Sequence, residues 1–521
     1  MGLTIMVGLV TITSCSPLWG TRDMLVTQQS PDLSLNTATL TSQPSVIPSS
    51  TLTLTPTKTI TTTSTPTQVM TREIETQTPL TDTPGISYYT QPGDSLTSIA
   101  SRFGVAEADI ASDFPLPSEG LIDPDTLVIM PEVIYGDISP STQLIPDSEV
   151  IFSLSAIDFN VQNYVEAGGG YLNEYREYLS SSGLTSGSDI VARIALENSM
   201  NPRLLLAVLE YQTGWVTGKL ENPSDVDFPM GYIDQYSKGL YRQLVLASED
   251  ISIGYYGWRS GSLTELEFSD GTTIRIAPSL NAGTVGLLYY FSLQNSFANW
   301  SAIIDPSSGF MNFYEIMMGD PWMRAKAVEP LFPPGITQPT LVLPLVPGDT
   351  WSLTGGPHAA FEKRGAWAAL DFGPGTEHST PCYQSDSWVL ATASGQVVRS
   401  GNGIVILDLD NDGYEQTGWN ILYLHIATRD RVQVGTLLNI GDKVGHPSCE
   451  GGSSTGVHFH IARKFNGEWI LADGALPFNL SGWVAHNGSE PYKGSLTRDG
   501  EIVISSSTGT ASSKIVRLPG E

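Results

Sequence analysis

The hydrophobic pattern of this chain of 521 residues changes near Leu341, and the change excludes one uniform fold. From about 160 to 333, apolar residues recur at helical spacing, as Ile190 and Ile194 do. Beyond Leu341, short β-rich runs alternate with glycine-rich turns, which is typical of antiparallel strands. The sequence therefore predicts a multidomain protein with a mainly α middle domain and a C-terminal antiparallel all-β domain.

The N-terminal segment indicates export. Residues 2–14 are mostly apolar and lead to Cys15, an arrangement that resembles a bacterial lipoprotein signal. This resemblance implies a signal over 1–15, lipidation of Cys15 and an extracytoplasmic protein anchored to the membrane of the cell envelope. An ordinary cleaved signal peptide is the alternative. Residues 16–85 are rich in Ser, Thr and Pro, and we expect them to form a disordered linker.

The net charge and the cysteine content of the chain are consistent with an exported protein. Asp and Glu number 54 against 26 Lys and Arg, a formal charge of -28, which repels phosphate backbones and excludes nucleic acid as an expected partner. Of the three cysteines, lipidation of Cys15 would leave Cys382 and Cys449. We expect these two to form one disulfide outside the cytoplasm, and two unrelated buried thiols are the alternative.

Residues 86–133 predict a small module. The segment 88–96 is typical of a strand, a Pro-Gly turn and a helix start, and 124–131 predicts a second strand. One apolar helical face is formed by Leu96, Ile99, Ala100 and Phe103. These features resemble the LysM module, a βααβ domain that binds N-acetylglucosamine-containing glycans such as peptidoglycan. The resemblance implies glycan binding, and a purely structural spacer is the alternative.

The middle domain is expected over 156–335. The segment 201–215 resembles the catalytic helix of lysozyme-like transglycosylases, whose glutamate protonates the glycosidic oxygen. Gln212 occupies that position here and cannot supply the proton. Glu210 lies roughly 200° around the helix and is a poor substitute. We therefore expect a lysozyme-like domain that is non-catalytic, either glycan-binding or a helical spacer, rather than a working muramidase.

All seven histidines fall in the C-terminal part of the chain: His358, His378, His425, His446, His458, His460 and His486. His458 and His460 alternate on a predicted strand, so both rings project to one side, about 6–7 Å apart. This spacing lets one ring bind a metal while the other acts on the attacking water. Two histidines and one carboxylate with an open fourth position form a usual catalytic zinc set.

The segment from about Pro344 to Asn479 resembles the lysostaphin-type zinc endopeptidases, most closely their beta-lytic branch. The resemblance is carried by Gly-Gly-Pro-His ending at His358, by Asp371, and by Cys-Glu-Gly-Gly-Ser-Ser-Thr-Gly-Val-His-Phe-His ending at His460. Trp367 stands where lysostaphin has its first ligand. The beta-lytic branch instead takes that ligand from an upstream Gly-x-His segment, which His358 matches.

The resemblance implies a role for each residue of this set. His358, Asp371 and His460 would bind Zn²⁺. His458 would be the general base, and His425 would orient or stabilise the oxyanion of the tetrahedral intermediate.

We expect this zinc endopeptidase domain over 336–490, followed by a C-terminal extension over 491–521. The expected function is hydrolysis of peptide bonds in peptidoglycan cross-links by a zinc-activated water, with peptidoglycan bound by its glycan at the LysM module and by its peptide at the zinc site. One alternative is a catalytically silent lipoprotein that binds the wall and activates amidases. Another is a glycan-binding adhesin.

A second candidate metal site lies in the same domain. Asp408, Asp410 and Asp412 alternate before Gly413, as at the start of a calcium loop. Trp419 stands where such a loop has its glutamate. A polar hairpin turn between two strands is the alternative.

Overall fold

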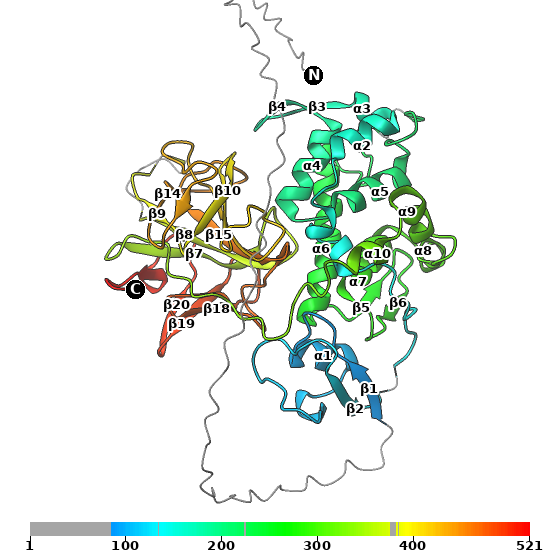
Figure 1. Cartoon of the computed structure of the whole chain (residues 1–521), viewed down its shortest axis with the longest axis horizontal. Coiled ribbons are helices and arrows are strands. Elements are labelled where there is room, and N and C mark those ends of the chain that lie inside the picture. The colour runs from blue at the N-terminus through cyan, green and yellow to red at the C-terminus, as the bar shows by residue number, and fades with distance from the viewer. Residues whose placement is uncertain (1–84, 134, 223–225, 376–381, 384) are drawn as a thin grey trace, which may run out of the picture. The chain divides into compact units, whose positions relative to one another are not determined.

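The computed structural model describes residues 85–521 except 134, 223–225, 376–381 and 384. The expected signal, Cys15 and linker residues 16–84 lie outside the described residues. Figure 1 shows a small N-terminal module, a helical region and a strand-rich C-terminal region. Within the described ranges, no helix combines the length and hydropathy needed to cross a bilayer.

The N-terminal module consists of β1 (Gly85–Tyr89), α1 (Leu96–Phe103), the 3₁₀-helix η1 (Glu107–Asp109) and β2 (Leu127–Pro131). β1 and β2 pair antiparallel. Ser95 begins α1 with a capping box, and Gly104, in the left-handed region, ends it. The second helix expected of a βααβ module is shortened to η1. Pro115 and Pro117 follow in the next loop, where they cannot donate helical hydrogen bonds.

The helical region also carries short strands and 3₁₀ turns. Its elements are η2 (Asp147–Glu149), η3 (Leu154–Ala156), α2 (Val161–Gly168), α3 (Tyr171–Glu174), β3 (Arg176–Leu179), β4 (Gly183–Ser186), α4 (Gly187–Asn198), α5 (Pro202–Thr213), α6 (Leu240–Ser260), β5 (Glu265–Glu267), β6 (Thr273–Arg275), α7 (Ala282–Gln294), α8 (Phe297–Ile303), α9 (Phe310–Met318) and α10 (Pro321–Ala325). α7 is apolar around most of its circumference and lies in the core. It packs closely against α6, since a Cβ on Gly254 would lie 2.9 Å from the Cα of Gly286.

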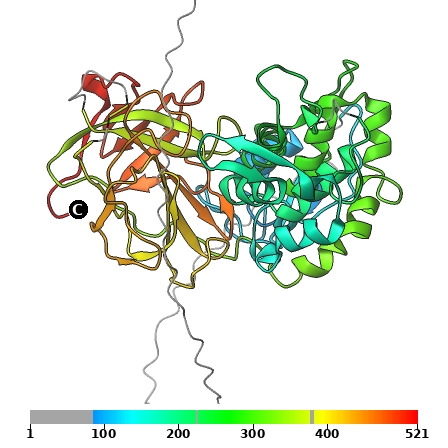
Figure 2. The same cartoon turned by 90° about the horizontal axis from the view of Figure 1, so that it is seen from above.

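The C-terminal region confirms the predicted antiparallel β architecture. A nine-stranded sheet has the order β13-β10-β11-β12-β15-β8-β7-β21, with β16 beside β15. Its strands are β7 (Thr350–Ala359), β8 (Trp367–Gly373), β10 (Gly395–Gly401), β11 (Ile404–Asp408), β12 (Trp419–Leu424), β13 (Leu437–Leu438), β15 (Phe459–Phe465), β16 (Glu468–Trp469) and β21 (Lys514–Val516). Figure 2 shows the strand-rich region from above, in colours from yellow-green to red.

Smaller sheets complete this region. A four-stranded sheet contains β17 (Asn479–Leu480), β18 (Trp483–Asn487), β19 (Gly494–Arg498) and β20 (Glu501–Ile504), and a strand pair contains β9 (Val389–Leu390) and β14 (Lys443–Gly445). A 3₁₀-helix, η5 (Ala511–Ser513), precedes β21. Residues 491–521, expected as an extension, thus supply β19 and β20 to the smaller sheet and β21 to the edge of the main one.

Both faces of the main sheet are buried. Along β11, Val405 and Leu407 point into the core of the strand-rich region, whereas Ile404 and Ile406 belong to a core that includes the helices. Successive side chains of a strand point to opposite faces, so this alternation assigns one face to each core. The helical region and the sheet therefore share one hydrophobic core.

A buried arginine links the three regions. Arg259, at the end of α6, forms ion pairs of 2.8 Å with Asp147 and with Glu468 of β16. It also donates a hydrogen bond to the carbonyl oxygen of Pro92 in the N-terminal module. The hydroxyl of Tyr255 donates to Glu468 at 2.7 Å. Removal of the guanidinium would leave two buried carboxylates without their cation.

We expect Arg259→Ala to lower the free energy of unfolding by about 3–5 kcal/mol, the usual cost of breaking a buried ion pair from one side. Urea unfolding followed by intrinsic fluorescence measures this. Lys238→Ala is the matched control, because the Lys238–Asp227 pair is half exposed on both sides and such pairs contribute about 0–1 kcal/mol. Equal effects of the two substitutions would contradict the expectation.

Candidate metal centre

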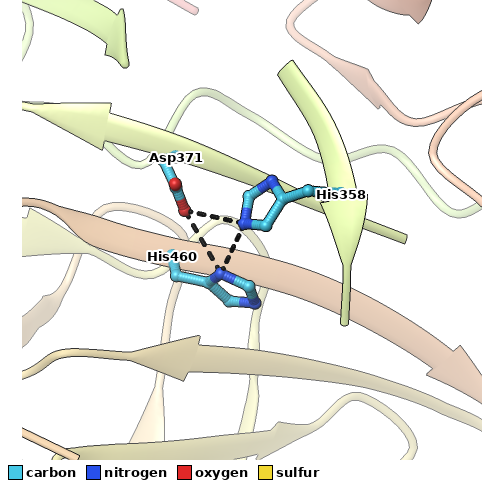
Figure 3. A group of neighbouring side chains, drawn as sticks. All are labelled: His358, Asp371 and His460. Atoms are coloured by element: carbon cyan, nitrogen blue, oxygen red, sulfur yellow. Dashed lines mark hydrogen bonds and ion pairs between the residues drawn. The ribbon is translucent and has the colours of Figure 1, made fainter. Parts of the chain in front are cut away.

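Three neighbouring strands bring His358, Asp371 and His460 together, as their side chains in Figure 3 show. His460 on β15 lies directly opposite Asp371 on β8. The register of β7 against β8 shifts between Gly355 and His358, and this irregularity places His358 beside the other two. Only glycine fits at 355, because a Cβ there would lie 2.6 Å from Oδ2 of Asp371.

The ring nitrogens of this cluster are oriented by backbone carbonyls. His358 Nδ1 lies 2.8 Å from the carbonyl oxygen of Gly356, and His460 Nε2 lies 2.9 Å from that of Ala360. A carbonyl only accepts, so these two nitrogens carry the protons. The opposite nitrogens, His358 Nε2 and His460 Nδ1, therefore present lone pairs toward each other across 3.0 Å.

Asp371 contributes the third electron pair that points into this cluster. Its Oδ1 lies 3.2 Å from each of these nitrogens, yet no hydrogen bond of normal geometry reaches this buried oxygen among the described residues. Three electron pairs facing one another repel unless a cation lies between them. Zinc bound tetrahedrally at about 2.0–2.1 Å separates its ligand atoms by about 3.4 Å. The residues present fit a zinc ion.

The protonation states of these side chains also favour a bound zinc ion. Burial would raise the pKa of Asp371, but the charge interactions with His358 and His458 outweigh it and hold this pKa well below its usual range. Burial lowers the pKa of His460. An ionised carboxylate and a neutral imidazole are the forms that bind a metal.

His458 and His425 lie beside this cluster. His458 Nε2 is 3.7 Å from Asp371 Oδ1, and the rings of His458 and His425 are 4.6 Å apart. Each donates its Nδ1–H to a carbonyl oxygen at 2.8 Å, His458 to Gly456 and His425 to Glu450. Both rings thus keep an Nε2 lone pair that can accept a proton.

The position of His458 differs from the prediction that it lies on a strand with His460, and His425 lies just outside a strand. β15 begins at Phe459, and His458 lies just before it in an isolated bridge with Ser448. His425 follows the end of β12 with φ +63°, a conformation uncommon for residues other than glycine. Burial, followed by the nearby His458 and His460, lowers the pKa of His425 to about 3. Its ring is therefore neutral near pH 7 and donates to an oxyanion only after gaining a proton.

A cleft of about 1270 Å³ opens at this site. Its lining includes the four histidines, the 450–458 loop, and Tyr178 and Leu179 from the β3–β4 hairpin of the helical region. Tyr492 stacks on His358 with ring centroids 4.1 Å apart. Neither the hairpin nor Tyr492 lies in a motif, so neither was predictable from the sequence.

Other residues singled out in the sequence lie elsewhere. His446 contacts the carbonyl of Ser387, His486 contacts Thr497, and His378 is outside the described residues. In α5, Gln212 contacts the hydroxyl of Tyr290 and Glu210 accepts from the backbone of Val216 and Thr217. The carboxylates of Asp408, Asp410 and Asp412 lie within 4.8 Å of one another.

A disulfide joins Cys382 to Cys449, which directly precedes the cleft loop. The bridge spans a sequence separation of 67 residues, and closing a loop of this length stabilises a fold by about 4 kcal/mol on the chain-entropy estimate. We expect the Cys382→Ser, Cys449→Ser protein to lose about 2–4 kcal/mol in urea unfolding. Cys15→Ser is the control and should lose nothing. Mass spectrometry that finds both thiols free in unreduced protein would refute the bridge.

Comparisons with known proteins agree with these features. The family model "LysM domain" matches residues 88–113, and "LasA, N-terminal domain" matches 143–331, where the sequence predicted a lysozyme-like domain. Protease LasA of Pseudomonas aeruginosa strain UCBPP-PA14 is 24% identical over 361 residues, covering 64% of this chain and 77% of that protein.

Two solved structures give weaker matches. The M23 metalloprotease pseudoalterin from the deep sea is 22% identical, covering 32% of this chain and 96% of its own, with a TM-score of 0.28. The catalytic domain of lysostaphin from Staphylococcus simulans is 24% identical, covering 23% of this chain and 87% of its own, with a TM-score of 0.17. The family match and the LasA similarity show that this chain combines a LysM module with a resemblance to a known protease.

Proposed function

We propose that the protein is a zinc-dependent endopeptidase that cleaves peptide bonds in peptidoglycan cross-links. The observation that carries the proposal is the convergence of three metal-binding atoms, from His358, Asp371 and His460, at the wall of a large cleft. The similarity to protease LasA supports a peptidase. The LysM match supports a cell-wall substrate.

In this proposal His458 and His425, which lie beside the three ligands, have different roles in the reaction. Bound zinc supplies a Lewis acid that polarises the scissile carbonyl and acidifies water. His458, whose Nε2 is unprotonated, takes a proton from the attacking water and returns it to the leaving nitrogen. His425 is neutral in the resting state; it takes up the remaining proton of the attacking water, donates a hydrogen bond to the oxyanion as a cation, and then passes this proton to the leaving amine.

The remaining regions place the substrate. The LysM module would hold the glycan, for which exposed Tyr89 and Phe114 offer stacking surfaces. A lipid at Cys15 would keep the enzyme at the cell envelope, with the linker as its tether. We propose boundaries of 86–133 for the glycan-binding module, 156–335 for a non-catalytic helical domain and 336–490 for the peptidase.

The zinc-loaded protein should release new amino termini from purified peptidoglycan. A chelator should reduce the release to background, because the site then lacks its Lewis acid, and added zinc should restore it. Fluorescent labelling of amino termini measures the reaction. If protein with one zinc per chain releases none from any peptidoglycan, the amidase-activating alternative should replace the proposal.

A further inference from the structure

The hairpin between β11 and β12 carries a second cluster of oxygen ligands. Asp408, which ends β11, is buried, while Asp410 and Asp412 are exposed, and their carboxylates lie within 4.8 Å of one another. Within the part of the chain that the structure describes, none of the three forms an ion pair with Lys or Arg. The neighbouring cations, Arg399 and Lys464, are both bound to Glu415. The three carboxylates therefore face one another with backbone N–H groups and the Thr417 hydroxyl as donors, and with no cationic side chain among the described residues.

An independent observation points into the same loop. Asn420 on β12 is fully buried and lies directly opposite Asp408 on β11. Its Nδ2 donates to the carbonyl of Thr417 at 2.7 Å, which turns the amide toward the loop. No hydrogen-bond partner of its Oδ1 is found among the residues that the structure describes. A buried amide oxygen without a partner is unfavourable, and a cation bound in the loop would supply the missing partner.

From these observations we propose that the Asp408–Asn420 hairpin binds a calcium ion. The donors are carboxylate and amide oxygens with no nitrogen or sulfur among them, which suits a hard cation rather than zinc. Gly413 adopts φ +91° and allows the sharp turn after the third aspartate. A Cβ at Gly418 would collide with the Asp410 carboxylate, so the backbone leaves room for that ligand.

The ion binds far from the peptidase site. β12 runs from Trp419, at the hairpin, to Leu424, next to His425, and its six residues span about 20 Å. The calcium ion therefore holds the hairpin and leaves the zinc cluster unchanged. Trp419 replaces the bidentate glutamate of high-affinity loops, so we expect a dissociation constant of about 10⁻⁴–10⁻³ M, as in extracellular modules.

Terbium luminescence of the full-length protein tests this site. Tyr414 lies in the loop and Trp419 begins β12 next to it, so both should sensitise bound Tb³⁺, which Ca²⁺ at millimolar concentration should displace. Asp410→Asn with Asp412→Asn should weaken Tb³⁺ binding at least tenfold. Asparagine keeps the oxygen that accepts the backbone N–H of Tyr414, so the fold should persist, as circular dichroism can verify. Single Asp412→Asn serves if the double variant does not fold.

Two controls separate this site from other cation binding. Asp499→Asn, an exposed carboxylate in the β19–β20 turn, should leave Tb³⁺ binding unchanged. His460→Ala should also leave Tb³⁺ binding unchanged, although this variant should no longer bind zinc. Equal affinity in the hairpin variants and the wild type would overturn the proposal, and so would loss of Tb³⁺ binding in His460→Ala.

Discussion

His460→Ala is expected to eliminate stoichiometric zinc and to reduce peptidoglycan hydrolysis to background. The substitution removes one of the three proposed ligand atoms and leaves only Asp371 and His358 of the proposed set. Changes in groups that only orient a ligand already cost about 10–100-fold in metal affinity, so loss of the ligand itself should cost more. Asp371→Ala should behave in the same way. Zinc per chain, measured by mass spectrometry after dialysis, is the primary readout.

The control for this prediction is His486→Ala. That histidine lies in the β18–β19 hairpin, where it contacts Thr497, so its replacement should leave zinc and activity intact. His358→Ala gives the sharpest test of the assignment, because Trp367 occupies the position of the first lysostaphin ligand. Full zinc in His358→Ala would contradict the ligand set.

His458→Ala should separate chemistry from metal binding. Its Nε2 is 3.7 Å from Asp371 Oδ1, farther than the nitrogens of the two proposed ligands. We therefore expect normal zinc content and a loss of about 10²–10⁴-fold in turnover, the contribution of a general base. His425→Ala should also keep zinc and lose about 10²–10³-fold. Release of amino termini at saturating substrate measures both.

One outcome would reverse the roles of His458 and His460. If His458→Ala loses zinc while His460→Ala retains it, His458 is the ligand and His460 the base. Retention of wild-type turnover by His458→Ala would remove it from the mechanism.

Sequence spacing predicts the relation between residues of the site that are close in the chain. It cannot predict how strands that are distant in the chain pair with one another. The alternation of His458 and His460 follows from strand geometry alone. That Asp371 lies opposite His460, and that an irregular β7 adds His358, depends on the order of three strands that are far apart in the chain. Family resemblance proposed this set, whereas periodicity could not.

The sequence also could not predict which backbone carbonyls and loops contact the site. The carbonyls of Gly356 and Ala360 fix the tautomers of the two proposed histidine ligands, and any residue type supplies a carbonyl. Tyr492 and the β3–β4 hairpin reach the cleft from regions without a motif. The helices of the middle region were predictable because their apolar faces repeat at a regular interval.

The core shared by the helices and the main sheet has a consequence for how such proteins diversify. Ile404 and Ile406 of the sheet are covered by residues from another part of the chain, so recombination that separated the two parts would expose them to water and to aggregation. The LysM module has a hydrophobic cluster of its own. We therefore expect the helical and sheet regions to be inherited as one indivisible unit, and LysM modules to be gained, lost or exchanged among relatives.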